Sequence, residues 1–113
     1  MQDTAMTDFE RDVIQASFRQ PVLVDFNATW CGPCRMLGPV LEQAVRLASG
    51  PMKLVIINTD ENSGLAASQG VSGIPDVRLF VNGQHIGGFK GFRTQPEVER
   101  FLKEHLALAS RPS

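Results

Sequence analysis

The chain has 113 residues, of which 42% are hydrophobic and 20% are charged, and its formal net charge is −1. This length suits one domain with a single core, and the composition excludes disordered and low-complexity proteins. A near-neutral chain without a cluster of Lys and Arg is not expected to bind nucleic acid or an anionic membrane.

The first predicted element is a helix over residues 8–18. Thr7 and Glu10 have the spacing of a capping box, in which two side chains cap the N–H groups of a helix start. Pro21 ends the segment. Neither a secretory signal nor a run of membrane-spanning length is recognisable, so a cytoplasmic protein is expected.

Residues 22–26 and 52–58 form two continuous apolar stretches typical of buried β-strands. Between them, helical spacing of apolar residues predicts a helix over residues 34–48, with a kink at Pro39. A short helix over residues 62–69 follows and is closed by a glycine. This order of strands and helices predicts that the two strands are parallel.

The remaining part of the chain is predicted to be antiparallel. Residues 76–89 hold two β-prone stretches joined by Asn82 and Gly83, a pair that favours a type I′ hairpin turn. Thr94 and Glu97 form a capping box for a last helix. Its apolar face consists of Val98, Phe101, Leu102 and Leu106. No repeat or linker is visible, so residues 1–113 are expected to form one domain, with a core over about 7–108 and loose termini.

The only two cysteines, Cys31 and Cys34, lie three residues apart in the segment TWCGPCR, after the first predicted strand. A structural disulfide is disfavoured, because so short a loop restricts the unfolded chain little and a reducing compartment does not preserve it. A metal site is disfavoured, because two more ligands are needed and His85 and His105 lack the spacing of a zinc module. Both histidines are interpreted as packing or surface residues.

Thiol exchange is the chemistry that this spacing favours. The first turn of a helix offers free N–H groups and a partial positive charge, which lower the pKa of a thiol such as Cys31. Cys34, one turn further on, can reach Cys31 and act as a resolving thiol from a less exposed position. Gly32 lets a partner backbone approach closely, and Pro33 starts the helix with its φ already set.

Three further positions near the cysteines are candidates for function. Asp25 lies within an apolar strand, where it is either a buried acid held by hydrogen bonds or a proton acceptor of raised pKa for Cys34. Trp30 is interpreted as contact surface rather than core. Pro75 is an ordinary turn proline by default, whereas a cis bond there would turn the Ile74 backbone towards a bound extended peptide.

The segments VDFNATWCGPCRMLGP, GIP and VNGQHIGGFKGF resemble thioredoxins, and the resemblance extends over residues 7–106. It implies the α/β thioredoxin fold, with a central mixed sheet of four to five strands flanked by about four α-helices. It also implies a cis bond before Pro75, and reduction of protein disulfides with Cys31 as attacking thiol, Cys34 as resolving thiol and Asp25 as buried acid. The substrate-binding residues expected on this basis are Trp30, Gly32, Pro33, Gly73, Ile74, Pro75 and Gly91.

The resemblance further implies disulfide-containing proteins as substrates and an NADPH-dependent thioredoxin reductase as the enzyme that recycles a monomeric protein. No cofactor or metal is expected beyond the redox-active disulfide. The alternative is a co-chaperone-like module that binds proteins through Trp30, Ile74 and Phe92 with secondary redox activity. The first strand usual in thioredoxins is expected to be absent or brief, because MQDTAM is short and poor in β-formers.

Three residues depart from the usual thioredoxin pattern: Asn27 replaces an aromatic residue, Ile56 a lysine and Asp76 a threonine. Without a cation at position 56, the pKa of Asp25 should be at least as high as in lysine-bearing relatives. Asp76 and Arg78 share one face of a strand, so we expect Arg78 to pair with Asp76 or with another nearby carboxylate, Asp25 or Asp60. The alternative is that both side chains reach solvent at a sheet edge.

Overall fold

The computed structural model describes residues 8–109 and contains a four-stranded sheet of order β2-β1-β3-β4. The parallel pair consists of β1 (Val22–Asn27) and β2 (Lys53–Asn58), while β3 (Asp76–Val81) runs antiparallel to both β1 and β4 (Gln84–Lys90). The predicted change from parallel to antiparallel strands is therefore confirmed. The turn is confirmed too, because Asn82 and Gly83 both have positive φ, as type I′ requires.

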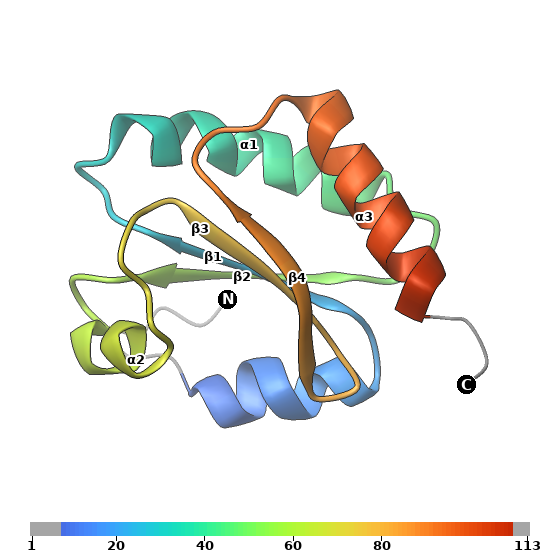
Figure 1. Cartoon of the computed structure of the whole chain (residues 1–113), viewed down its shortest axis with the longest axis horizontal. Helices are drawn as coiled ribbons and strands as arrows, with labels where there is room; N and C mark the ends of the chain where they lie inside the picture. The colour runs from blue at the N-terminus through green and yellow to red at the C-terminus, as the bar shows by residue number, and fades with distance from the viewer. Residues whose placement is uncertain (1–7, 110–113) are drawn as a thin grey trace.

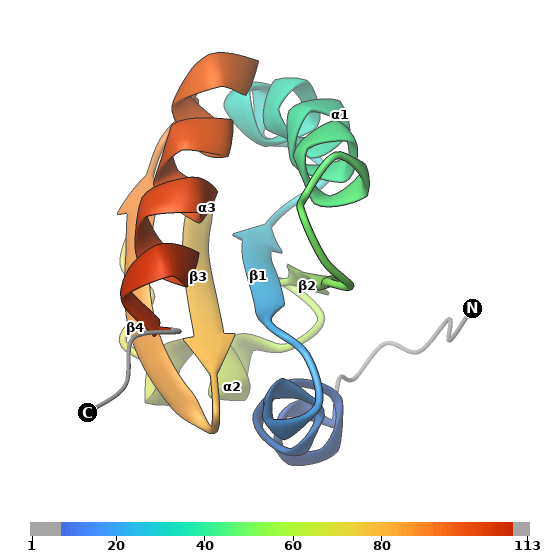
Figure 2. The same ribbon diagram turned by 90° about the vertical axis from the view of Figure 1, so that its right-hand side faces the viewer.

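Helices cover both faces of the mixed sheet, as predicted (Figures 1 and 2). On one face lie α1 (Gly32–Arg46), which continues through Pro39, and α3 (Gln95–Ala109). On the other lie α2 (Ser63–Ser68) and the N-terminal helical segment. No helix within residues 8–109 has the length and apolar character needed to cross a bilayer.

The central strand β1 separates two apolar clusters. Its residue Leu23 packs with Val77 and Leu79 of β3 beneath α1 and α3, whereas Val24 and Phe26 belong to the cluster on the other face. Residues 22–26 are all buried, which confirms the prediction of a strand covered on both sides. Because side chains alternate along a strand, this arrangement places Asp25 on the face covered by α1.

The prediction that residues 52–58 form a buried strand is only half right. The strand exists as β2, but Ile57 is its single buried residue and Ile56 keeps 44% of its surface exposed. The reason is position, since β2 pairs only with β1 among the described residues and forms an edge of the sheet. An apolar run alone does not distinguish an edge strand from a central one.

The N-terminal helical segment confirms the predicted helix in position, although its form is unusual. It consists of a π-helical stretch, Glu10–Gln15, followed by a 3-10 turn, Ala16–Phe18. Thr7, the loose termini and the question of an additional first strand fall outside the described residues. Asp8 fills a capping role, because its Oδ1 accepts a hydrogen bond from the backbone N–H of Arg11 at 3.0 Å.

The capping box of α3 is formed as predicted. The Thr94 backbone N–H donates to Glu97 Oε1 at 2.9 Å, and the Glu97 N–H donates to Thr94 Oγ1 at 3.4 Å. The hydrogen bonds that the Thr94 N–H and hydroxyl donate to Glu97 Oε1 lower the pKa of Glu97. The cap fixes the start of α3 directly after the segment that joins it to β4.

Candidate active site

Cys31 and Cys34 lie where β1 gives way to α1, joined by a disulfide with their Cα atoms 5.2 Å apart. Cys31 is the N-cap of α1, and its Sγ accepts a hydrogen bond from the Cys34 backbone N–H at 3.3 Å. Pro33 stands in the first turn of the helix. The same N–H group and the helix N-terminus would stabilise a Cys31 thiolate once the disulfide is reduced.

The two cysteines differ in exposure in the expected direction. Cys31 keeps 6% of its surface exposed and Cys34 keeps 1%. They form a small apolar cluster with Ala28, against which Ile74 packs. The sulfur atoms are therefore held in an apolar setting that reaches the surface at Cys31.

The loop before β3 completes one side of the site. The Ile74–Pro75 bond is cis, as the resemblance implied. The Pro75 carbonyl accepts a hydrogen bond from the Gly91 N–H at 2.9 Å, so the end of β4 is tied to the same loop. Gly91 has a φ of +82°, a conformation that glycine adopts without strain. Because Ile74 packs against the cysteine cluster, the loop with the cis proline lies beside the cysteines, and Gly91 is hydrogen-bonded to that loop.

Trp30 is 66% exposed, which confirms that it is surface rather than core. Its indole Nε1 donates a hydrogen bond to Asp60 Oδ2 at 2.9 Å. Asp60 is positioned in turn by Asn58, whose side-chain oxygen accepts from the Asp60 N–H at 2.8 Å. The sequence alone did not predict this hydrogen bond. Because β1 and β2 are parallel, however, Trp30 after β1 and Asp60 after β2 lie at the same end of the sheet.

Asp25 is fully buried on the α1 side of β1, between Ile56 of β2 and Val77 of β3. Neither carboxyl oxygen has a hydrogen-bond partner among the described residues, so the alternative of an acid held by hydrogen bonds is not observed there. Burial raises the pKa of Asp25 to about 7. The group can therefore change its protonation state near neutral pH.

Asp76 and Arg78 form the predicted ion pair. The guanidinium donates from Nε to Asp76 Oδ1 and from Nη2 to Oδ2, each at 3.1 Å. Nη1 donates to the Gln69 carbonyl at 2.6 Å, and the guanidinium lies 5.3 Å from the centre of the Phe26 ring. The exposed side-chain fractions are 11% for Arg78 and 4% for Asp76, so neither reaches solvent freely. Asp25 and Asp60 are not the partners.

The two histidines pack against aromatic rings. His85 stacks on Phe80 and His105 contacts Phe101, as expected for packing residues.

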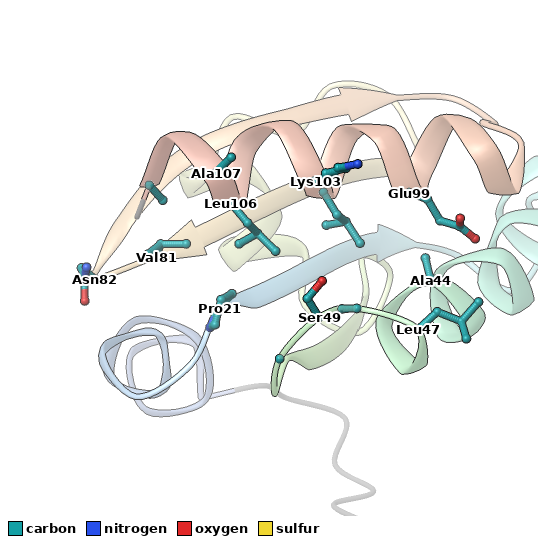
Figure 3. Close-up of a pocket in the computed structure, with 14 residues that line it drawn as sticks. Pro21, Ala44, Leu47, Ser49, Val81, Asn82, Glu99, Lys103, Leu106 and Ala107 are labelled. Atoms are coloured by element: carbon teal, nitrogen blue, oxygen red, sulfur yellow. The ribbon is translucent and has the colours of Figure 1, made fainter. Parts of the chain in front are cut away.

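A cavity of about 790 Å³ lies between α3 and the turn after α1, at the end of the sheet opposite the cysteines (Figure 3). Its lining includes Pro21, Leu47, Val81, Leu102 and Leu106. Residues 8–109 contain no group of three or more side chains suited to hold a metal ion.

Comparison with known proteins identifies the family of this chain. The family model described as thioredoxin matches residues 1–104. This chain belongs to the thioredoxin family. It is 43% identical to probable thioredoxin-2 of Caenorhabditis elegans over 103 residues, which cover 91% of this chain and 70% of the relative. It is 39% identical to thioredoxin 1 of Synechococcus elongatus over 104 residues, which cover 90% and 95% of the two chains.

A thioredoxin of Haemophilus influenzae is 36% identical over 99 residues, covering 88% of this chain and 91% of the relative. Family membership together with the Cys31–Cys34 disulfide makes the protein a thiol-disulfide oxidoreductase that reduces protein disulfides by dithiol-disulfide exchange. The alternative of a binding module with secondary redox activity is not favoured.

Proposed function

We propose that Cys31 is the attacking thiol and Cys34 the resolving thiol. In the first step the Cys31 thiolate attacks one sulfur of a substrate disulfide, and the other substrate sulfur leaves as a thiolate. In the second, the Cys34 thiolate attacks the Cys31 sulfur of the mixed disulfide and releases the remaining substrate sulfur. The substrate gains two electrons, and the protein is left with the Cys31–Cys34 disulfide. The greater exposure of Cys31 and its N-cap position support this division of roles.

Asp25 is the proton acceptor for Cys34 in this cycle. The observation that carries the proposal is a fully buried carboxyl, without a hydrogen-bond partner among the described residues, on the sheet face covered by the helix that bears Cys34. Its pKa of about 7 lets the ionised form exist at neutral pH and take the Cys34 proton. The protonated form that results is the one that burial stabilises.

The substrate segment binds across Trp30, Gly32, Pro33, the Gly73–Ile74–Pro75 loop and Gly91. A Cβ atom added to Gly32 or Gly73 would have no heavy atom within 4 Å, so both glycines border open space. An extended peptide can therefore approach the backbone closely at both glycines. The exposed Trp30 ring, fixed by its bond to Asp60, supplies a rigid apolar contact.

The remaining parts of the proposal follow from the family. Residues 1–113 act as one monomeric thioredoxin domain in the cytoplasm, where it contributes to electron transport and redox homeostasis. An NADPH-dependent thioredoxin reductase returns two electrons to the disulfide, and no further cofactor takes part. Neither nucleic acid nor a membrane is a partner, in keeping with the net charge of −1.

Insulin reduction with dithiothreitol tests the roles of the two thiols. Cys31→Ser should lose activity, because no thiolate remains to attack the substrate. Cys34→Ser should also lose turnover but accumulate mixed disulfides with substrate, which mass spectrometry detects. The proposed roles are wrong if Cys31→Ser keeps activity, or if the trapped adducts form through Cys34 in Cys31→Ser instead.

A further inference from the structure

We propose that Lys90 and Arg93 form a cationic rim that makes this thioredoxin prefer disulfides flanked by acidic residues. The proposal rests on the substrate groove proposed above. The two side chains bracket Gly91 and the exposed Phe92 on the chain segment KGFR, at the edge of that groove.

Lys90 lies beside the loop that carries the cis proline. Its Nζ is 3.4 Å from Ser72 Oγ, and Ser72 directly precedes Gly73. In the sheet, Lys90 is the register partner of Asp76. The Asp76 carboxylate is occupied by the two hydrogen bonds from Arg78, so it does not neutralise the ammonium group of Lys90. Lys90 therefore presents a positive charge to whatever binds along this loop.

Arg93 is held over the groove edge by its own backbone. Its Nη1 donates to the carbonyls of Lys90 at 2.9 Å and of Phe92 at 3.0 Å, and the guanidinium lies 5.2 Å from the centre of the Phe89 ring. The same Nη1 is 3.8 Å from the place where a Cβ atom on Gly91 would stand. Nε and Nη2 make no hydrogen bond within the described residues, so they remain available to a carboxylate.

The surrounding charges leave this rim positive. Hydrogen bonds from Thr94 at the start of α3 lower the pKa of Glu97, and the charges of Arg93 and Arg100 lower it further, so two cations face this one carboxylate. Among the described residues, neither Lys90 nor Arg93 forms an ion pair. An exposed apolar residue between two fixed cations suits a substrate segment that carries an apolar residue beside Asp or Glu.

The experiment compares synthetic disulfide peptides that differ only in whether the residues flanking the cysteine are Glu or Gln. The full-length reduced protein is mixed with each peptide at low salt, and the second-order rate of reduction is followed by Trp30 fluorescence. The readout is the ratio of the rate for the Glu peptide to the rate for the Gln peptide. We expect a ratio of about 3 to 10 for the wild type, falling towards 1 in high salt.

Matched variants separate a local rim from overall charge. Lys90→Gln/Arg93→Gln should bring the ratio close to 1, whereas Arg19→Gln/Lys103→Gln, which removes the same charge from exposed positions outside the rim, should keep it. Arg93→Lys should retain most of the ratio. A wild-type ratio near 1, or an equal loss in both double variants, would overturn the inference. Failure of the wild type to reduce even the Gln peptide would instead contradict the proposed groove and thiol roles.

Discussion

Asp25 and Asp76 are buried carboxyl groups on adjacent strands, but only Asp76 has a cationic partner. Asp25 lies on the α1 face of the sheet without a hydrogen-bond partner among the described residues, and burial raises its pKa to about 7. Asp76 lies on the other face and receives two hydrogen bonds from Arg78. The same type of side chain is thus left with a raised pKa at Asp25, which suits the proposed proton transfer, and is held in an ion pair at Asp76.

The difference also concerns the redox site. Asp76 follows the cis proline, and an uncompensated carboxylate there would disfavour the Cys31 thiolate and repel acidic substrate segments. The bidentate pair with Arg78 removes most of that field. Asp25 has no such partner, because the neighbouring strand offers Ile56 in register with it. Three substitutions test this difference, and each changes the surroundings or the charge of only one of the two carboxyl groups.

The largest effect is expected from Arg78→Leu. It leaves the buried Asp76 carboxylate without its partner, which should lower the free energy of unfolding by about 3 to 5 kcal/mol. Chemical denaturation at neutral pH measures the change. The control is Asp76→Thr/Arg78→Leu, which removes both charges and should be within about 1 kcal/mol of the wild type. A single variant no less stable than the double variant would mean that the pair contributes nothing inside the fold.

Asp25→Asn should stabilise the oxidised protein and slow turnover. Between the usual pKa of 3.8 and the folded value of about 7, the unfolded chain loses a proton that the folded protein keeps. The free energy of unfolding of the wild type therefore falls by at most about 4 kcal/mol as pH rises through this range. Above this range it stays constant. Asp25→Asn does not lose stability in this way, but its buried amide lacks a hydrogen-bond partner, which costs part of the advantage. At alkaline pH we therefore expect the variant to be more stable than the wild type by on the order of 2 kcal/mol.

Denaturation of both proteins over the range of about pH 4 to 9 measures this difference. The advantage of Asp25→Asn should grow up to neutral pH and then stay constant. Parallel stability curves over the whole range would show that Asp25 ionises normally in the folded protein.

Ile56→Lys should have the smallest effect. Ile56 is the register partner of Asp25 and is 44% exposed, so a lysine there can keep its ammonium group near solvent and still lie beside the carboxyl. The pKa of Asp25 should fall by about 1. The pH at which the wild-type stability curve levels off should shift downward accordingly. Ile56→Met is the matched control of similar length, and an identical shift in it would rule out an electrostatic cause.

Sequence reasoning reached much of this arrangement. The alternation along β3 predicted the Asp76–Arg78 pair, and the apolar run around Asp25 predicted its raised pKa, because both depend on local pattern. The cis bond at Pro75 came from family resemblance, since the local sequence favours an ordinary turn.

Contacts between loops were not predictable in the same way. The Trp30–Asp60 hydrogen bond depends on how the segments that follow β1 and β2 meet at one end of the sheet. The exposure of Ile56 was missed for a related reason, because the segment KLVIIN has the same apolar character at an edge as in the centre of a sheet.

The proposed role of Asp25 as proton acceptor is best tested by titrating its carboxyl group in the oxidised protein. Carbon-13 NMR of protein labelled at aspartate follows each carboxyl signal with pH, and the signal absent from Asp25→Asn identifies Asp25. We expect a midpoint near 7, because burial without a partner disfavours the charged form. A midpoint near the usual 3.8 would show that Asp25 is ionised throughout the neutral range and would contradict its role as the proton acceptor for Cys34.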